Sequence, residues 1–265
     1  MLLDILLSIA HNLIQKTAWP MEPPTPWSSF HIIFSLCGLF VAGILAIFLS
    51  NYYASKTEIS LPGTQILWIC GLILAVSEIY KQLFLYEIVN QNHYNWWYFP
   101  FQLCSTPMYL CLLFPVFSVR LQKAAAVYLE SFGFLGGIMA LAEPSGLMHP
   151  YWILTLHGFL WHILLIFLGF FCTGLNLSKK EEGVFSDSLA LFFIFCFIAT
   201  LINIFTRGKS DMFYISPYYP ITQIVFRQIS LTCGILPGII SYLLSICVGA
   251  FFCYKLLTAI FQKQS

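Results

Sequence analysis

The chain has 265 residues, of which 59% are hydrophobic, 18% are aromatic and only 9% are charged, and its formal net charge is +1 at pH 7. Soluble domains usually carry about 25% charged residues, so this composition excludes a water-soluble globule and indicates a polytopic membrane protein. The near-neutral charge gives no sign of a nucleic-acid partner.

The N-terminal segment, residues 1–27, is expected to lie on the membrane surface. MLLDILLSIAHNLIQK is short for a membrane span and lacks the basic start of a cleavable signal peptide. The apolar side of an interfacial helix can be formed by Leu2, Leu3, Leu6, Leu7 and Ile14. The following PMEPPTPW contains four prolines, which interrupt any helix before the first span.

The rest of the chain is predicted to form an all-α bundle of seven transmembrane helices, because a bilayer core requires about 20 apolar residues per helix. Seven runs qualify, at roughly 28–50, 64–87, 97–118, 122–142, 151–174, 187–206 and 232–257. The one long connection, 207–231, is expected to be ordered at the interface. We expect a single integral membrane domain, with a seven-helix bundle at 28–257 and a cytoplasmic tail at 258–265.

The orientation is predicted from Lys and Arg, which favour the cytoplasmic side of a membrane. One side of the predicted bundle holds seven of them: Lys56, Arg120, Lys123, Lys179, Lys180, Lys255 and Lys263. The other side holds four: Lys16, Arg207, Lys209 and Arg227. The N-terminus is therefore expected outside and the C-terminus in the cytoplasm. The expected location is the plasma membrane if the protein is bacterial, and the endoplasmic reticulum or Golgi if it is eukaryotic.

Polar side chains inside the predicted spans indicate a site, because such groups are costly in a bilayer and usually functional. At a rise of about 1.5 Å per residue, eight of them fall in the outer half of the bundle: His31, Glu78, Lys81, Cys104, His157, His162, Asn203 and Arg207. Glu130 lies nearer the inner third. This shared depth predicts an outward-facing site; the alternative is that these groups only bond to one another and hold the helices together.

Two pairs of these residues have informative spacing. Glu78 and Lys81 are three residues apart and share a helical face, where they can neutralise each other or orient a ligand. His157 and His162 are five apart, about 140° around a helix, so only one is expected to point squarely into the site. His157 lies at the better depth for Cys104.

The stretch YFPFQLCSTPMYLC, residues 98–111, places a thiol beside a proline in a predicted span. Pro107 has no N–H, so the Leu103 carbonyl loses its helical partner and the helix is expected to kink. A kink would open space beside Cys104, whose thiol becomes a useful nucleophile when a base such as His157 takes its proton. Nearby polar side chains can satisfy the freed backbone groups: Gln102, Ser105 and Thr106.

The order and spacing of these motifs resemble the YwaF family, which includes the eukaryotic transmembrane protein 164. The resemblance covers most of the chain. It rests on His31, EIYK at 78–81, PFQLC at 100–104, the ESFGFLGG and EP motifs within 130–144, the LTLHG histidine, and IN at 202–203. The eukaryotic relative is an acyltransferase that moves a fatty acyl chain from a phospholipid onto a lyso ether-phospholipid.

The resemblance implies a two-step acyl transfer between membrane phospholipids and lysophospholipids. Cys104 corresponds to the nucleophile that forms an S-acyl intermediate, and His157 would be the base. The oxyanion is expected at Gln102, Asn203 or backbone N–H groups. The lipid phosphate is expected at Arg207, Lys209 or Lys81. No metal and no diffusible cofactor is needed.

Two other functions remain open. A transporter or receptor could bind a small polar ligand in the same outer cavity, although no inverted repeat is evident. An intramembrane lipid hydrolase could use the same cysteine and histidine on water. Nine cysteines are present, mostly in apolar runs and without a CxxC pair, so neither a disulfide framework nor a metal site is expected.

Overall fold

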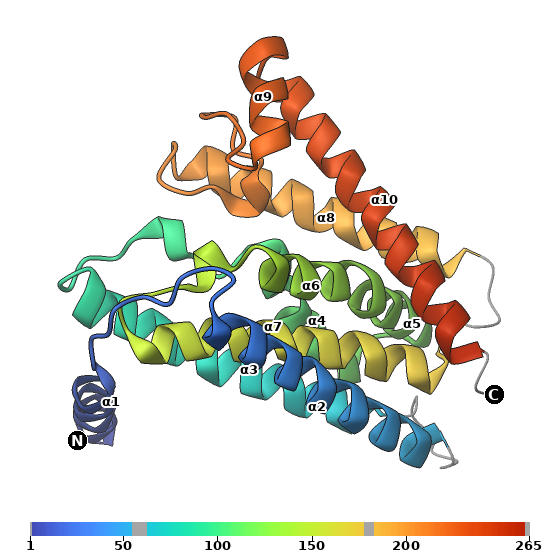
Figure 1. Ribbon diagram of the computed structural model, residues 1–265, viewed down its shortest axis with the longest axis horizontal. Helices are drawn as coiled ribbons and strands as arrows, with labels where there is room; N and C mark the ends of the chain where they lie inside the picture. Colours follow the sequence, from blue (N-terminus) through green and yellow to red (C-terminus); the bar gives the residue numbers. More distant parts are fainter. Residues whose placement is uncertain (1, 55–62, 178–182, 263–265) are drawn as a thin grey trace.

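The computed structural model describes residues 2–54, 63–177 and 183–262. Within these ranges every regular element is a helix, and Figure 1 shows most of them running side by side. Six of the described helices are long and apolar enough to cross a membrane, which confirms the predicted membrane bundle. Helix formation satisfies the backbone polar groups internally, and the apolar side chains suit contact with lipid.

The six long helices agree with six of the seven predicted spans. Two of them contain a π-helical turn, at Leu85–Val89 and at Leu129–Gly133. Their bounds are α2 (Ser29–Ala54), α3 (Thr64–Phe84, continuing to Val89), α5 and α6 as one rod (Val119–Tyr128 and Phe134–Ala142), α7 (Trp152–Leu175), α8 (Val184–Phe205) and α10 (Ile235–Gln262).

The third predicted span, 97–118, differs from the prediction. It consists of a 3-10 turn at Trp96–Tyr98 and a separate short helix, Leu103–Val116, whose central part is α4 (Thr106–Leu113). This helix is shorter than the about 20 residues that a bilayer core requires. Only six of the described helices therefore have the length of a full span.

Pro107 lies near the start of this short helix. Pro107 does not kink a long helix, as the sequence predicted; it lies in the first turn of α4, where a missing N–H removes no helical hydrogen bond. The Leu103 carbonyl is satisfied by the Thr106 hydroxyl, which donates to it at 2.8 Å, as expected. The thiol of Cys104 consequently sits at the start of a helix, not in its middle.

The α5–α6 rod lies at the centre of the bundle, because its side chains are the most enclosed of the six long helices. Its aromatic rings Tyr128 and Phe132 stack at 5.0 Å between centroids, and Phe132 stacks on Phe192 of α8 at 4.6 Å. Elsewhere in the bundle, α4 packs closely on α3 at Gly71. A Cβ on Gly71 would lie 2.7 Å from the Leu112 nitrogen, so only glycine allows this approach.

The long connection 207–231 is ordered, as predicted. It contains a 3-10 turn at Met212–Tyr214, and α9 (Ile224–Cys233) forms a hairpin with α10 (Figure 1). Met212 and Phe213 are almost fully buried in the main core. This segment is therefore part of the bundle rather than a free loop.

The predicted N-terminal helix is present as α1 (Leu2–Thr17), and Figure 1 shows it nearly end-on while the bundle helices run across the view. It packs through Ile14, which is 1% exposed against Phe84, Leu85 and Leu154. The His11 ring contacts the Glu87 carboxylate at 2.8 Å. A helix lying across the end of the bundle has the placement expected of an interfacial helix.

Ile14→Ala is expected to loosen α1, because deleting a buried isoleucine side chain costs about 2–5 kcal/mol. Limited trypsin digestion measures this, since Lys16 becomes a substrate only when α1 unfolds. Ile9→Ala is the control, because Ile9 is 58% exposed on the same helix. Equal cleavage rates for the two variants would show that Ile14 does not hold α1 in place.

Four charges used for the orientation lie outside the described residues: Lys56, Lys179, Lys180 and Lys263. Among the described residues, Arg120 at the start of α5 forms a two-pronged ion pair with Asp187 at the start of α8, with both distances 2.8 Å. This pair fixes the starts of α5 and α8 at the same end of the bundle. The assignment of that end to the cytoplasm stays a prediction.

Candidate functional site

A cavity of about 170 Å³ lies between α3, the start of the Leu103–Val116 helix and α7. It is at the same end of the bundle as α1, since Leu85 and Leu154 both line it and contact Ile14. Its polar lining consists of Glu78, Lys81, Tyr98, Cys104, Ser105, His149, His157 and His162. The structure therefore brings together five residues that the sequence placed at one depth: Glu78, Lys81, Cys104, His157 and His162.

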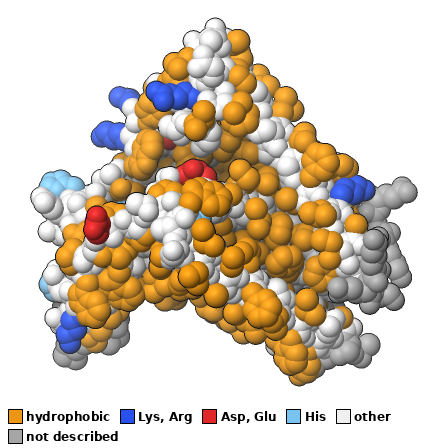
Figure 2. All heavy atoms as spheres, viewed as in Figure 1, with side chains coloured by type: hydrophobic (Ala, Val, Ile, Leu, Met, Phe, Trp, Pro, Cys, Tyr) orange, Lys and Arg blue, Asp and Glu red, His pale blue; other side chains and the backbone are white. Residues whose placement is uncertain are grey.

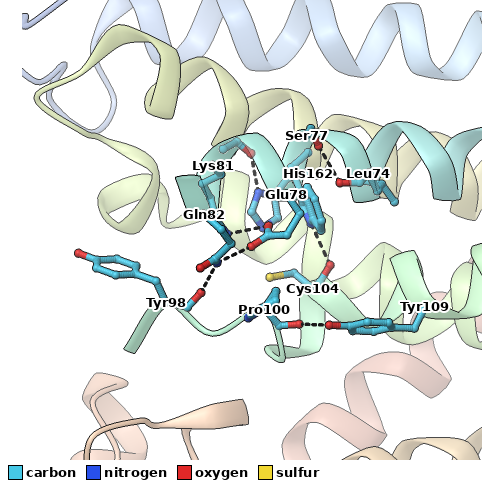
Figure 3. A network of polar contacts seen from close by, with 12 residues as sticks. Leu74, Ser77, Glu78, Lys81, Gln82, Tyr98, Pro100, Cys104, Tyr109 and His162 are labelled. Atoms are coloured by element: carbon cyan, nitrogen blue, oxygen red, sulfur yellow. Dashed lines mark hydrogen bonds and ion pairs between the residues drawn. The ribbon is translucent and has the colours of Figure 1, made fainter. Parts of the chain in front are cut away.

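Cys104 is presented by the first turn of its helix. Its backbone carbonyl accepts a hydrogen bond from the Trp161 indole N–H at 2.9 Å, which fixes this turn against α7. Figure 3 shows its sulfur projecting toward the side of the site that carries Glu78. The partial positive charge at the first turn of a helix favours the thiolate, but burial has the larger effect and raises the pKa of Cys104 to about 11, so the thiol needs a base to react.

Glu78 and Lys81 form the charged wall of the cavity. The Lys81 ammonium contacts the Glu78 carboxylate at 2.7 Å, and the Gln82 amide donates to the other carboxylate oxygen at 2.7 Å (Figure 3). Gln82 also donates to the Tyr98 carbonyl at 2.6 Å. Both carboxylate oxygens are thus occupied, and the two charges neutralise each other inside the bundle.

Both histidines of α7 line the cavity. The expectation that only one of them points squarely into the site stays a prediction. The cavity-facing stripe of α7 runs through Gly158 and Trp161. Successive residues of a helix are about 100° apart around its axis. His157 and His162 therefore lie on opposite sides of this stripe, each about 70° from its centre. Each imidazole reaches inward from one edge of the helix face, so an angular separation of about 140° does not exclude a shared site.

The two rings differ in their hydrogen bonds. The His162 Nδ1 lies 2.7 Å from the Gly158 carbonyl, which only accepts, so Nδ1 carries the proton and Nε2 keeps a free lone pair. The His157 Nε2 is buried and has no hydrogen-bond partner among the described residues. His162 is therefore held in the tautomer that a base requires, whereas no hydrogen bond fixes the tautomer of His157.

A third histidine, His149, lines the cavity and was missed by the sequence reasoning. Thr155 holds its backbone, accepting from the His149 N–H at 2.9 Å and donating to its carbonyl at 3.2 Å. Its Nδ1 is also buried without a partner in the described structure, and burial lowers the pKa of His149 below its ordinary value. The signal available was its position directly before the helix that carries the other two histidines.

Two predicted site residues lie elsewhere. His31 is 2% exposed, and both ring nitrogens are bonded: Nδ1 accepts from the Trp27 N–H at 3.0 Å, and Nε2 donates to the Leu141 carbonyl at 2.9 Å. It ties the start of α2 to the end of α6. Glu130 is 2% exposed in the π-helical turn between α5 and α6, and it does not line the cavity.

The remaining predicted residues, Gln102, Asn203 and Arg207, surround the segment after α8. Gln102 donates to the Asp211 carbonyl and accepts from the Phe213 N–H, both at 2.8 Å. Asn203 bonds to both backbone groups of Met212. Arg207 is exposed with a φ of 50° in the turn that follows α8. None of the three lines the cavity of Cys104.

In the part of the chain that the structure describes, no group of three or more His, Cys, Asp or Glu side chains could hold a metal ion. The cavity chemistry available from its own residues is that of a thiol, imidazoles and one neutralised ion pair. These are the groups of nucleophilic and acid–base chemistry.

The apolar helices, with a cavity that several polar side chains line, define a polytopic integral membrane protein. The model of the TMEM164 family matches residues 26–257, nearly the whole chain, and the protein therefore belongs to the TMEM164 family. The resemblance drawn from the motifs is thereby confirmed. Neither the curated proteins nor the solved structures contain a match to this chain.

Proposed function

We propose that this protein transfers a fatty acyl chain between a phospholipid and a lysophospholipid through an S-acyl intermediate on Cys104. The observation that carries the proposal is the cavity that Cys104 shares with His157 and His162. A thiol at a helix start, with an imidazole lining the same cavity, has the parts of an activated nucleophile.

In the first step, a histidine Nε2 takes the thiol proton, and the Cys104 sulfur bonds to the ester carbonyl carbon. The C–O bond to glycerol breaks, and the lysophospholipid leaves with the proton from the imidazolium. In the second step, the hydroxyl of a lysophospholipid acceptor gives its proton to the same imidazole and attacks the thioester. The new ester forms and the thiol is regenerated.

His162 is the better candidate for this base. Its Nδ1–H is anchored on the Gly158 carbonyl, so its Nε2 is unprotonated and oriented, as a general base requires. His157, the base expected from the sequence, lines the other edge of the same helix face. We propose that it contacts the lipid or the acceptor hydroxyl.

We propose that backbone N–H groups in the first turn of the Leu103–Val116 helix donate hydrogen bonds to the oxyanion. The first N–H groups of a helix lack i−4 partners and can donate to developing negative charge. The Ser105 N–H already donates to the Gln102 carbonyl at 2.8 Å, which leaves those of Leu103 and Cys104 as the candidates. Ser105 adds a hydroxyl to the same lining. Gln102 and Asn203, which the sequence suggested for this role, use their amides on the backbone of residues 211–213.

The size of the cavity restricts what enters it. Pockets that enclose a drug-sized ligand have volumes of about 300–1,000 Å³, whereas this cavity is about 170 Å³. It can hold the reacting ester and part of the glycerol, while the acyl chains stay in the surrounding hydrocarbon. A membrane lipid is thus a better fit than a soluble acyl donor.

The test uses the purified protein with a phospholipid labelled in its acyl chain, with and without an unlabelled lysophospholipid. Acyl transfer predicts labelled product phospholipid only when the acceptor is present. Release of labelled free fatty acid, independent of the acceptor, would instead indicate a hydrolase. Absence of both products, together with flux of a polar ligand across vesicles, would support a transporter.

His162→Ala is expected to lower the transfer rate by about 10²–10⁴-fold, the usual contribution of a positioned base. His157→Ala is the matched control on the same helix, with a smaller effect on the rate constant than on the apparent affinity for lipid. Initial rates at several lipid concentrations separate the two effects. A larger loss of the rate constant in His157→Ala would reassign the base to His157.

A further inference from the structure

We propose that a second site, at the same end of the bundle, binds a phosphocholine headgroup. It is a hollow of about 530 Å³ lined by Asn90, His93, Tyr94, Asn95, Trp96 and Lys209. Its role as the headgroup subsite of the lipid substrate rests on the proposed acyl transfer. Its ability to bind the headgroup does not depend on catalysis and can be measured separately.

The phosphate is assigned to Lys209. The sequence left three cations open for this role, and the structure separates them. Lys81 is neutralised by Glu78 at 2.7 Å, and Arg207 does not line the hollow. Lys209 is exposed, and none of the ion pairs between described residues involves it. In Figure 2, Lys and Arg side chains gather at the upper left of the molecule, around the loops that follow α8.

The quaternary ammonium is assigned to the aromatic corner. The rings of Tyr94 and Trp96 meet at 88° with 5.3 Å between their centroids, and Trp96 also contacts Phe99 at 5.5 Å. Tyr94 is 47% exposed, so its ring is accessible to a ligand. Two perpendicular rings form adjacent walls of the kind that surround choline groups through cation–π attraction. Lysine and aromatic walls in one hollow match a zwitterion with a phosphate and an ammonium.

The two sides of the hollow come from distant segments, 90–96 and the turn after α8, and the structure holds them in register. Gln102 joins them through its bonds to Asp211 and Phe213. Trp97 contacts the ring of Tyr219 at 6.5 Å between centroids. A site whose walls are fixed in advance loses less free energy on binding. This gives Gln102 a positioning role instead of the role of oxyanion donor.

The hollow and the Cys104 cavity are lined by residues that are close together in the sequence. Trp96 lines the hollow and Tyr98, two residues later in the same 3-10 turn, lines the cavity. The bond from Gln82 to the Tyr98 carbonyl fixes this turn on α3. A glycerophospholipid carries its phosphate on one glycerol carbon and an ester on the next carbon. We assign the headgroup of one lipid to the hollow and this ester to the side of the thiol.

The experiment measures binding to the full-length protein in a maltoside detergent by titration calorimetry. The probes are dihexanoyl phosphatidylcholine, dihexanoyl phosphatidylglycerol, free phosphocholine and inorganic phosphate. We expect the choline lipid to bind roughly tenfold more tightly than the glycerol lipid, the scale of one or two cation–π contacts. Binding of free phosphocholine alone, without a gain from the lipid, would assign the site to a soluble ligand and overturn the headgroup role.

The variants test each half of the site. Lys209→Met, at an exposed position, is expected to weaken both phospholipids about tenfold through the lost charge-assisted contact. Trp96→Leu is expected to remove the preference for choline, and Trp96→Phe to keep part of it. The controls are Lys16→Met and Trp68→Leu, which change the same residue types away from the hollow. Equal affinity for both lipids, or no change in Lys209→Met, would overturn the proposal.

The two proposals fail separately. Choline-selective binding that depends on Lys209, in a protein without acyl transfer, would keep this site and remove the proposed reaction. Acyl transfer that depends on Cys104, with no headgroup preference in the wild type, would keep the reaction and remove this site.

Discussion

Replacement of Cys104 by alanine is expected to abolish acyl transfer, with a loss of about 10³-fold or more, because the covalent route has no other nucleophile at this position. Cys104 presents its thiol at the start of the Leu103–Val116 helix, in the cavity lined by three histidines. The measurement is the initial rate of label transfer between phospholipid and lysophospholipid. A second measurement is a hydroxylamine-sensitive acyl group on the protein, which the variant should lack.

Cys111→Ala is the matched control for this experiment. Cys111 lies on the same short helix, is fully buried and does not line the cavity, so its variant should keep transfer and acylation. Thermal melting of both variants separates lost chemistry from lost folding. Transfer that persists in a folded Cys104→Ala protein would rule out the covalent mechanism and leave the cavity as a binding site.

Lys81→Met is expected to destabilise the protein by about 3–5 kcal/mol, the cost of leaving one charge of a buried pair without its partner. Glu78 is 4% exposed, and without Lys81 its carboxylate keeps only the hydrogen bond from Gln82. The measurement is the shift in melting temperature in detergent. The double variant Glu78→Gln with Lys81→Met is expected to recover most of the loss, because it leaves no buried charge.

The pair at the opposite end of the bundle provides the control. Arg120 and Asp187 have similarly short contacts, but the Arg120 side chain is 82% exposed. Water and salt screen such a pair, so Arg120→Met should leave the melting temperature almost unchanged. A Lys81→Met variant that melts no lower than Arg120→Met would mean that the Glu78–Lys81 pair is solvated and that the cavity is open to water.

Several features of the candidate site could be predicted from the sequence, because the depth of a residue in the membrane depends only on its position along its own helix. A rise of about 1.5 Å per residue places each polar side chain at a level, whatever its neighbours are. That reasoning put Cys104, Glu78 and Lys81 at one level, and they line one cavity. The direction of each side chain around its helix was harder to infer, and both histidines of α7 entered the site from its edges.

The candidate residues that lie outside the cavity, and the one that was missed, depend on loops. Gln102 and Asn203 bond to residues 211–213, and the partners of Gln102 are more than a hundred positions away in the chain. His149 lies in a connection that the search for polar groups within spans did not cover. The hollow around Lys209 joins two such connections. No local pattern specifies how two irregular segments pack against each other.

The sequence by itself determined that this is a helical membrane protein, where six of its long helices run, and that its reactive groups share a level. Those properties follow from apolar run length and helix rise, which are local. Only the tertiary structure decided that Pro107 lies in the first turn of α4, that Trp161 fixes the Cys104 turn, and that His162 carries its proton on Nδ1. Each of these depends on a specific hydrogen-bond partner, and partners are chosen by packing in three dimensions.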